Sequence, residues 1–237
     1  MKKILILASN PRKDLNLDQE IRQLREVIDN SRDREDFELV DALAVRVGDL
    51  HELMFKHRPQ IVHFCGHGGG AQGLLLNSDK GQEQLVGTEA LSELFSLCAR
   101  QFNVECVLLN ACYSQEQARK IRAHIKYVIG MNQEIRDDAA IAFSIGFYRA
   151  LGYACGIEDA YKFGCNAIQL EISGSSPRSM VAEPQRKLEV IDTFKNTAIP
   201  EHLKPVLILN PSLSLPHVDR TISEEVRSKI HLGIDKR

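Results

Sequence analysis

Five short apolar runs, rich in leucine and β-branched residues, constrain the fold of this chain more than any other feature of its sequence. Most of these runs are continuous instead of alternating with polar residues, and that pattern is typical of strands buried on both faces of a sheet. Such strands occur mainly in parallel sheets that helices cover on both sides. The runs comprise residues 4–8, 37–45, 61–65, 104–109 and 127–129.

Helical patterns separate several of these runs. Apolar residues recur every three or four positions over residues 17–28, behind Asn16, and over residues 91–98, behind Thr88. Asn and Thr are both suitable N-caps. Residues 137–169 are helical in pattern as well. Alternating strands and helices predict an α/β fold with a largely parallel sheet between two helical layers.

The remaining segments suggest how the chain is organised. Residues 73–86 read as a β-hairpin, and residues 1–172 form the predicted core. Residues 173–198 are predicted to be an exposed loop or insertion, because residues 173–187 contain two prolines and four serines. An edge strand within residues 199–216 would close the core, and residues 217–237 form a tail.

Charge and cysteine content exclude several classes of protein. Thirty basic and thirty-two acidic residues give a formal charge of -2, so we expect no direct nucleic-acid partner and no membrane partner. The apolar run at residues 4–8 is too short for an export signal. Six cysteines lack the dense spacing of secreted disulfide-rich domains, which favours reduced thiols and a cytoplasmic location.

Two motifs at strand ends could carry chemistry. Gly-His-Gly-Gly-Gly at residues 66–70 follows one apolar run, and Asn-Ala-Cys-Tyr-Ser at residues 110–114 follows another. In open parallel sheets, substrates gather beyond the carboxyl ends of the strands. We therefore expect His67 and Cys112 to meet at the same edge of the sheet.

The surroundings of Cys112 favour a reactive thiolate. Ser114 and Gln117 have the spacing of a capping box, which predicts a helix start just after the cysteine. The positive end of that helix and a nearby imidazole would lower the thiol pKa. The amides at Cys112 and Gly68 could form an oxyanion hole, and His67 could serve as general acid and base.

Other interpretations of these motifs are weaker. A lone cysteine at a strand end is usually structural, but a histidine before three glycines is costly in backbone entropy, so the pair favours function. The glycine run lacks phosphate-loop and dinucleotide-site spacing, and no GxSxG esterase motif occurs. His63, Cys65, His67 and Cys112 lack standard zinc spacing, so we expect no metal and no cofactor. A non-catalytic interaction module, a small-molecule thiol hydrolase and a nucleotide-binding α/β protein remain the alternatives.

From residue 3 to about residue 171, the chain resembles the CHAT domains of the caspase-like, separase-related peptidases, in a form like those of bacteria. Gly-His-Gly at residues 66–68 and Ala-Cys at residues 111–112 carry the resemblance. It implies a caspase-like three-layer αβα sandwich with a mainly parallel sheet. It also implies a cysteine endopeptidase with His67 and Cys112 as its dyad and amides near Gly68 and Cys112 as its oxyanion hole.

The resemblance extends to substrate and regulation. Asn110, two residues before the cysteine, would help to line the pocket for a substrate side chain. Some relatives that prefer basic residues carry Asp there, so the cleavage preference stays open. CHAT domains are commonly effectors that stay silent until a sensor acts, so this chain is either one domain of a larger protein or is regulated by a separate sensor or activator protein. We also expect a protein or peptide substrate as a partner, and a homodimer as a further candidate. Basic residues within 173–187 would suit self-processing, and a passive loop is the alternative.

Overall fold

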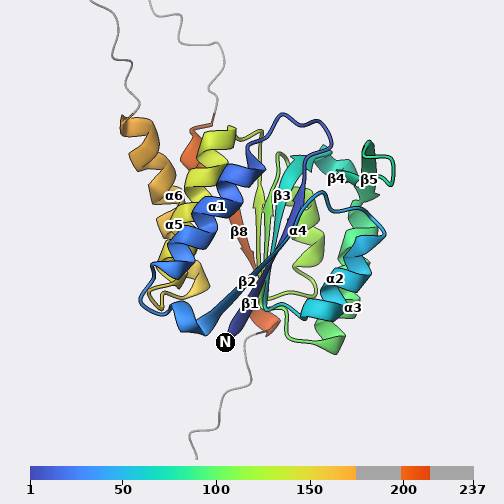
Figure 1. Cartoon of the computed structure of the whole chain (residues 1–237), viewed down its shortest axis with the longest axis horizontal. Coiled ribbons are helices and arrows are strands. Elements are labelled where there is room, and N and C mark those ends of the chain that lie inside the picture. Colours follow the sequence, from blue (N-terminus) through green and yellow to red (C-terminus); the bar gives the residue numbers. More distant parts are fainter. Residues whose placement is uncertain (175–198, 214–237) are drawn as a thin grey trace, which may run out of the picture.

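A central sheet with helices on both faces forms the computed structural model, which describes residues 1–174 and 199–213 (Figure 1). The strand order is β2-β1-β3-β6-β7-β8, with a hairpin of β4 and β5 extending from β3. The first five strands of that path are parallel, and β8 pairs antiparallel with β7 at the edge. The strands are β1 (Lys2–Ser9), β2 (Phe37–Ala42), β3 (Ile61–Gly68), β4 (Gly73–Asn77), β5 (Glu83–Gly87), β6 (Cys106–Asn110), β7 (Tyr127–Met131) and β8 (Pro205–Leu209).

Six α-helices of the described chain form the outer layers, three on each face of the sheet (Figure 1). One layer contains α1 (Leu17–Asp29), α5 (Asp137–Leu151) and α6 (Ile157–Gly174). The other contains α2 (Asp49–His57), α3 (Thr88–Gln101) and α4 (Gln115–Ile121). Each layer closes its own apolar core. The predicted α/β sandwich with a mainly parallel sheet is therefore confirmed.

Strand β1 shows why the apolar runs are continuous. Ile4 and Ile6 pack into the core under α1, α5 and α6, whereas Leu5 and Leu7 pack into the opposite core. Successive side chains of a strand point to opposite faces. A strand covered on both faces must therefore be apolar at every position.

Several predicted boundaries change in the structure. Strand β2 stops at Ala42, and Ala44 follows with a left-handed φ of 51°. Helix α2 was not predicted, because only Leu50 and Met54 of its nine residues are buried. Helix α6 continues to Gly174, so the predicted loop begins later than residue 173. The rest of that loop and the predicted tail lie outside the described residues.

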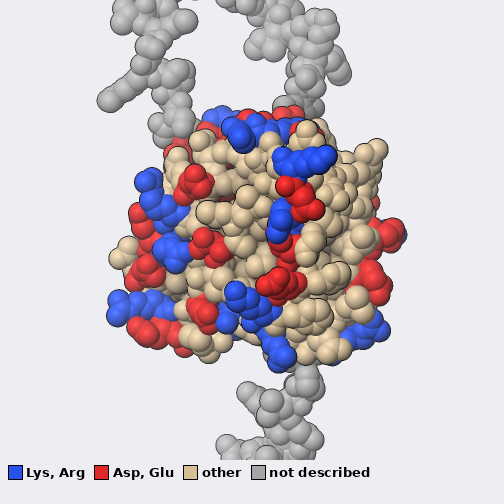
Figure 2. Space-filling view, turned by 45° about the vertical axis from the view of Figure 1, so that its right-hand side comes forward, with Lys and Arg blue, Asp and Glu red and all other residues tan. Residues whose placement is uncertain are grey.

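The predicted hairpin and edge strand are confirmed. Strands β4 and β5 pair antiparallel, and β8 pairs only with β7 among the described strands. None of the helices in the described ranges is long and apolar enough to cross a membrane. On the face in Figure 2, basic and acidic side chains are interspersed, in keeping with the small net charge of -2.

Candidate active site

Strands β3 and β6 bring the two sequence motifs together. Their parallel register pairs Cys65 with Asn110 at the last position of the ladder. Residues two positions further along have side chains on the same face. On β3 that residue is His67, and beyond β6 it is Cys112. The structure thus places both predicted residues at neighbouring strand ends, as the sequence predicts.

The glycine loop contacts the cysteine turn through its backbone. A β-carbon built on Gly68 would lie 1.8 Å from the carbonyl oxygen of Cys112 and 3.2 Å from its nitrogen. Only glycine permits this approach. Among the described residues, no backbone carbonyl accepts a hydrogen bond from the Cys112 N–H. An oxyanion hole from the amides near Gly68 and Cys112 stays a prediction that this geometry allows.

The Cys112 thiol is half-buried and weakly bonded. Its Sγ lies 3.7 Å from the carbonyl oxygen of Ile135. Burial raises the pKa of the Cys112 thiol, and the carboxylate of Glu134 acts in the same direction. The lowered pKa expected from the helix end and a nearby imidazole was wrong, because desolvation of the half-buried sulfur is the largest influence on the pKa of Cys112.

A strained turn presents Cys112. Tyr113 has a left-handed φ of 55°, and its N–H donates to the carbonyl of Gln133 at 3.2 Å. A non-glycine residue in this conformation costs roughly 1–2 kcal/mol and is frequent at functional sites. Ser114 anchors the turn from beneath, because its Oγ donates to Leu109 and accepts from the N–H of Met131, each at 2.9 Å.

The predicted capping box is replaced by a different arrangement. Ser114 does occupy the N-cap position of α4, but its side chain makes no capping hydrogen bond. Gln117 instead donates through Nε2 to the carbonyl of Gly70 at 2.8 Å and to Oγ1 of Thr88 at 2.7 Å. Thr88 in turn donates to the carbonyl of Ala71 at 2.9 Å. Gln117 therefore fastens the glycine loop to the helix that follows the cysteine.

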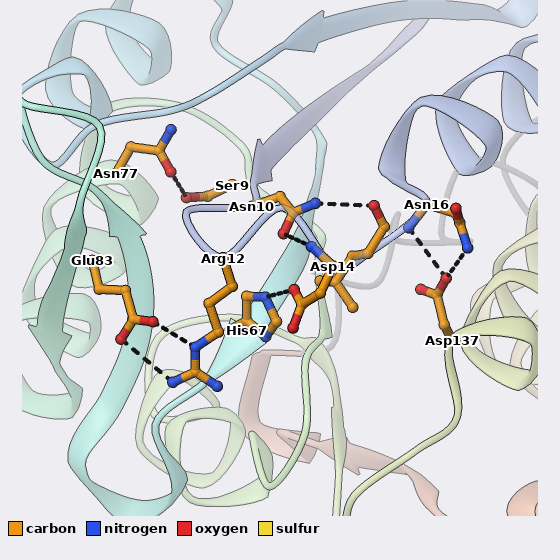
Figure 3. A network of polar contacts seen from close by, with 10 residues as sticks. Ser9, Asn10, Arg12, Asp14, Asn16, His67, Asn77, Glu83 and Asp137 are labelled. Atoms are coloured by element: carbon orange, nitrogen blue, oxygen red, sulfur yellow. Dashed lines mark hydrogen bonds and ion pairs between the residues drawn. The ribbon is translucent and has the colours of Figure 1, made fainter.

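A carboxylate that the sequence did not single out lies beside His67. Nε2 of His67 is 2.8 Å from Oδ1 of Asp14 (Figure 3). The distance suits an ion pair, although the direction of the ring N–H does not meet hydrogen-bond geometry. His67 is largely shielded, with 12% of its side chain exposed, whereas 57% of the Asp14 side chain is exposed. Asp14 is placed to orient the imidazole.

The β1–α1 loop that carries Asp14 is tied down at several points (Figure 3). Ser9 Oγ at its start donates to Oδ1 of Asn77 at 3.1 Å. Arg12 Nε lies 2.5 Å from Oε1 of Glu83 on β5. At the far end, Asn16 Nδ2 donates to Oδ2 of Asp137 at 2.8 Å. These contacts hold the loop beside the end of β3, where sequence spacing alone could not place it.

Asn110 lies inside the protein, below the cysteine turn. It is 5% exposed, and its Nδ2 lies within hydrogen-bond distance of Glu20 Oε1 at 2.8 Å, Ser144 Oγ at 3.1 Å and the Ala140 carbonyl at 3.2 Å. The carboxamide thus faces helices α1 and α5. Its role in a substrate pocket stays a prediction.

The zinc alternative gains no support. Within residues 1–174 and 199–213, no group of three or more His, Cys, Asp or Glu side chains is disposed to hold a metal ion. His63 is fully buried and stacks on Tyr148, with ring centroids 5.7 Å apart. It is a core residue.

Sequence comparison connects this site to known proteins. The family model described as the CHAT domain matches residues 16–161, more than half of the chain. A "Probable protease" of Gillisia limnaea is 26% identical over 215 residues, which cover 89% of this chain and 35% of that protein. A "Roc-COR-CHAT protease" from an unknown prokaryotic organism is 25% identical over 175 residues, or 71% of this chain and 16% of that protein. The chain therefore spans only a minor part of these relatives.

Structural comparison gives a matching fold. A secreted C11 cysteine protease from Bacteroides thetaiotaomicron, solved with an irreversible peptide inhibitor, has a TM-score of 0.50. It is 15% identical, and the match covers 68% of this chain and 56% of that one. At this identity the likeness concerns the fold alone. The caspase-like three-layer fold expected from the sequence is confirmed.

Proposed function

This chain belongs to the CHAT domain family, and from that premise we propose that it is a caspase-like cysteine endopeptidase with Cys112 as nucleophile and His67 as acid–base partner. The observation that carries the proposal is the contact of Gly68 with the Cys112 backbone. That contact puts the histidine and cysteine motifs side by side at the carboxyl end of the sheet, where parallel sheets bind substrates.

The chemistry follows from the two side chains. Cys112 sulfur attacks the scissile carbonyl, and its proton passes to His67. Amides of the cysteine turn and the glycine loop face the negative oxygen that develops. His67 then protonates the leaving amine, so that a thioester remains on Cys112. A water molecule gives a proton to His67 as it attacks the thioester, and that proton returns to the sulfur when the acid product leaves.

The raised pKa of Cys112 fits an attack assisted by a base. In the free protein the thiol is largely protonated at neutral pH, because burial disfavours the thiolate. His67 therefore has to remove the proton as a substrate binds. In the proposal, Asp14 holds the imidazole in position for that transfer, since its Oδ1 lies 2.8 Å from Nε2.

The context of the activity is also part of the proposal. The relatives are longer than the match, so a whole protein would hold this domain among others. We propose a regulated effector in the cytoplasm that cleaves protein substrates when a sensor or activator acts on it. A homodimer would be one route to such regulation.

One observation favours a second candidate, a non-catalytic interaction module. The half-buried thiol with a raised pKa is the state expected of an unreactive cysteine. A family member that has lost activity could keep the same fold as a docking platform.

Peptide hydrolysis by purified variants separates the two candidates. Cys112→Ala and His67→Ala should each abolish cleavage of a fluorogenic peptide library, and the double variant should lose little more, because the two residues act as a unit. Cys165→Ala, a change at another half-buried thiol, should retain activity. Full activity in Cys112→Ala would overturn the proposal. Absence of cleavage by the wild type, with or without relatives' sensor domains, would favour the docking module.

A further inference from the structure

A carboxylate lies buried beneath the candidate active site. Glu20 on α1 is 2% exposed, and a single oxygen, Oε1, accepts hydrogen bonds from Asn110 Nδ2 and from Ser144 Oγ, each at 2.8 Å. Nε2 of His63 lies 3.6 Å from the same oxygen. Glu20 thus joins α1 to the end of β6 and to α5, at a place where an acidic residue is costly to bury.

We propose that Glu20 is a positioning residue for Cys112, because its carboxylate holds Asn110 and so fixes the point at which the cysteine turn leaves strand β6. This inference rests on the function proposed above. Asn110 is the last residue of β6, and only the buried Ala111 separates it from Cys112. Because only one residue separates Asn110 from Cys112, a displacement of the Asn110 side chain also displaces the Cys112 sulfur.

The charges around Glu20 leave its carboxylate without a cation. From β3 it faces His63, whose pKa burial lowers to about 3, and Cys65, whose pKa burial raises. From α5 it faces Asp137, a like charge at the helix start, and Tyr148, whose pKa burial also raises. No lysine or arginine of the described part of the chain pairs with Glu20. Hydrogen-bond donors alone stabilise its anion.

The geometry makes the anchor sensitive to pH. Burial raises the pKa of Glu20 to about 7, and the bonds from Ser144 and Asn110 offset that shift only in part. The ionised carboxylate accepts charge-assisted hydrogen bonds, which are about twice as strong as neutral ones. The anchor on Asn110 is therefore firmer above neutral pH and looser below it.

Alkylation of Cys112 measures the position of the turn without requiring peptidase activity. The wild type and Glu20→Gln would be treated with iodoacetamide between about pH 5.5 and 8.5, and the modified Cys112 peptide followed by mass spectrometry. We expect the ratio of wild-type to variant rates to change roughly five- to tenfold, with its midpoint near the pKa of about 7. Glu26→Gln, an exposed change on the same helix, should follow the wild type.

A second variant keeps the proposal testable if Glu20→Gln does not fold. Ser144→Ala removes one of the two hydrogen bonds that favour the Glu20 anion. The pH dependence of Cys112 alkylation should therefore have its midpoint at a higher pH in Ser144→Ala than in the wild type. A ratio of wild-type to Glu20→Gln alkylation rates that stays constant with pH would overturn the inference, and so would an unmoved midpoint in Ser144→Ala.

Peptide hydrolysis is assayed in parallel. Loss of the pH effect with hydrolysis intact refutes the Glu20 inference alone, whereas a clear effect without any hydrolysis refutes the proposed function alone.

Discussion

Gly68 lies so close to Cys112 that a β-carbon on the glycine would stand 1.8 Å from the cysteine carbonyl oxygen. The neighbour is backbone, which cannot move aside like the end of a flexible side chain. The cysteine turn is itself held by Ser114, through bonds to Leu109 and Met131. The glycine after the histidine is therefore a packing requirement of the site.

Gly68→Ala should separate the glycine loop from the cysteine turn. We expect kcat/KM for peptide cleavage to fall by about 100-fold or more, because the reacting groups would be displaced by an ångström or so. Overpacking should also lower the free energy of unfolding by about 1–3 kcal/mol. Gly48→Ala is the control, since its added carbon meets nothing within 4 Å. Wild-type kinetics in Gly68→Ala would contradict the described contact.

Asp14→Asn should weaken the hold on the His67 imidazole. We expect kcat to fall by roughly tenfold with little change in KM, an effect smaller than for a buried partner because more than half of the Asp14 side chain is exposed. Asp29→Asn, at the exposed end of α1, should leave both unchanged. Equal kinetics in the two variants would exclude a role for Asp14.

Gln117→Leu should release the glycine loop from α4. The change removes the donor to Gly70 and Thr88 and leaves two acceptors without it, which should cost about 1–3 kcal/mol of unfolding free energy. Activity should fall too, because the loop carries the residues after His67. Thermal unfolding and kcat/KM would be measured beside Glu116→Ala, an exposed change on the same helix. A stable, fully active Gln117→Leu would show that the loop needs no such tie.

Peptidase activity should survive a chelator and disappear on thiol alkylation. The proposed nucleophile is a sulfur, and the candidate zinc ligands lack standard spacing. Since burial raises the pKa of Cys112, its alkylation in the free protein should keep accelerating as the pH rises above neutral. Activity lost to EDTA and restored by zinc would favour a metal enzyme instead.

The sequence predicted the fold and the meeting of the two motifs because both follow from periodicity. Successive residues of a strand that is covered on both faces must all be apolar, as in β1. The carboxyl ends of neighbouring parallel strands meet at one edge of the sheet, as at His67 and Cys112. Asp14 could not be found in that way. It reaches the histidine through a loop whose course depends on side-chain contacts such as that of Arg12 with Glu83.

The pKa of Cys112 shows a second limit of sequence reasoning. A helix start after the cysteine was predicted correctly, and Gln115 does begin α4. The sign of the pKa shift was wrong, because it depends on how much water the packed turn excludes. The sequence predicted that Gln117 forms a capping box with Ser114 at this helix start. Its hydrogen bonds go instead to Gly70 and Thr88, which lie far from it in the sequence.

The buried Glu20 should make stability depend on pH in a direction that is unusual for a carboxyl group. Its pKa in the folded protein is about 7, above the ordinary 4.5, so the folded state binds its proton more tightly than the unfolded state does. That contribution to stability is fully present below about pH 4.5 and is lost as the pH rises through about 7. Glu20→Gln carries no titrating group at this place. The unfolding free energy of the wild type minus that of Glu20→Gln should therefore decrease by up to about 3 kcal/mol from pH 4.5 to pH 8, measured by urea unfolding at each pH. If this difference in unfolding free energy increases from pH 4.5 to pH 8, Glu20 gains a cationic partner or water on folding. In that case the two hydrogen bonds to Oε1 are not what stabilises its charge.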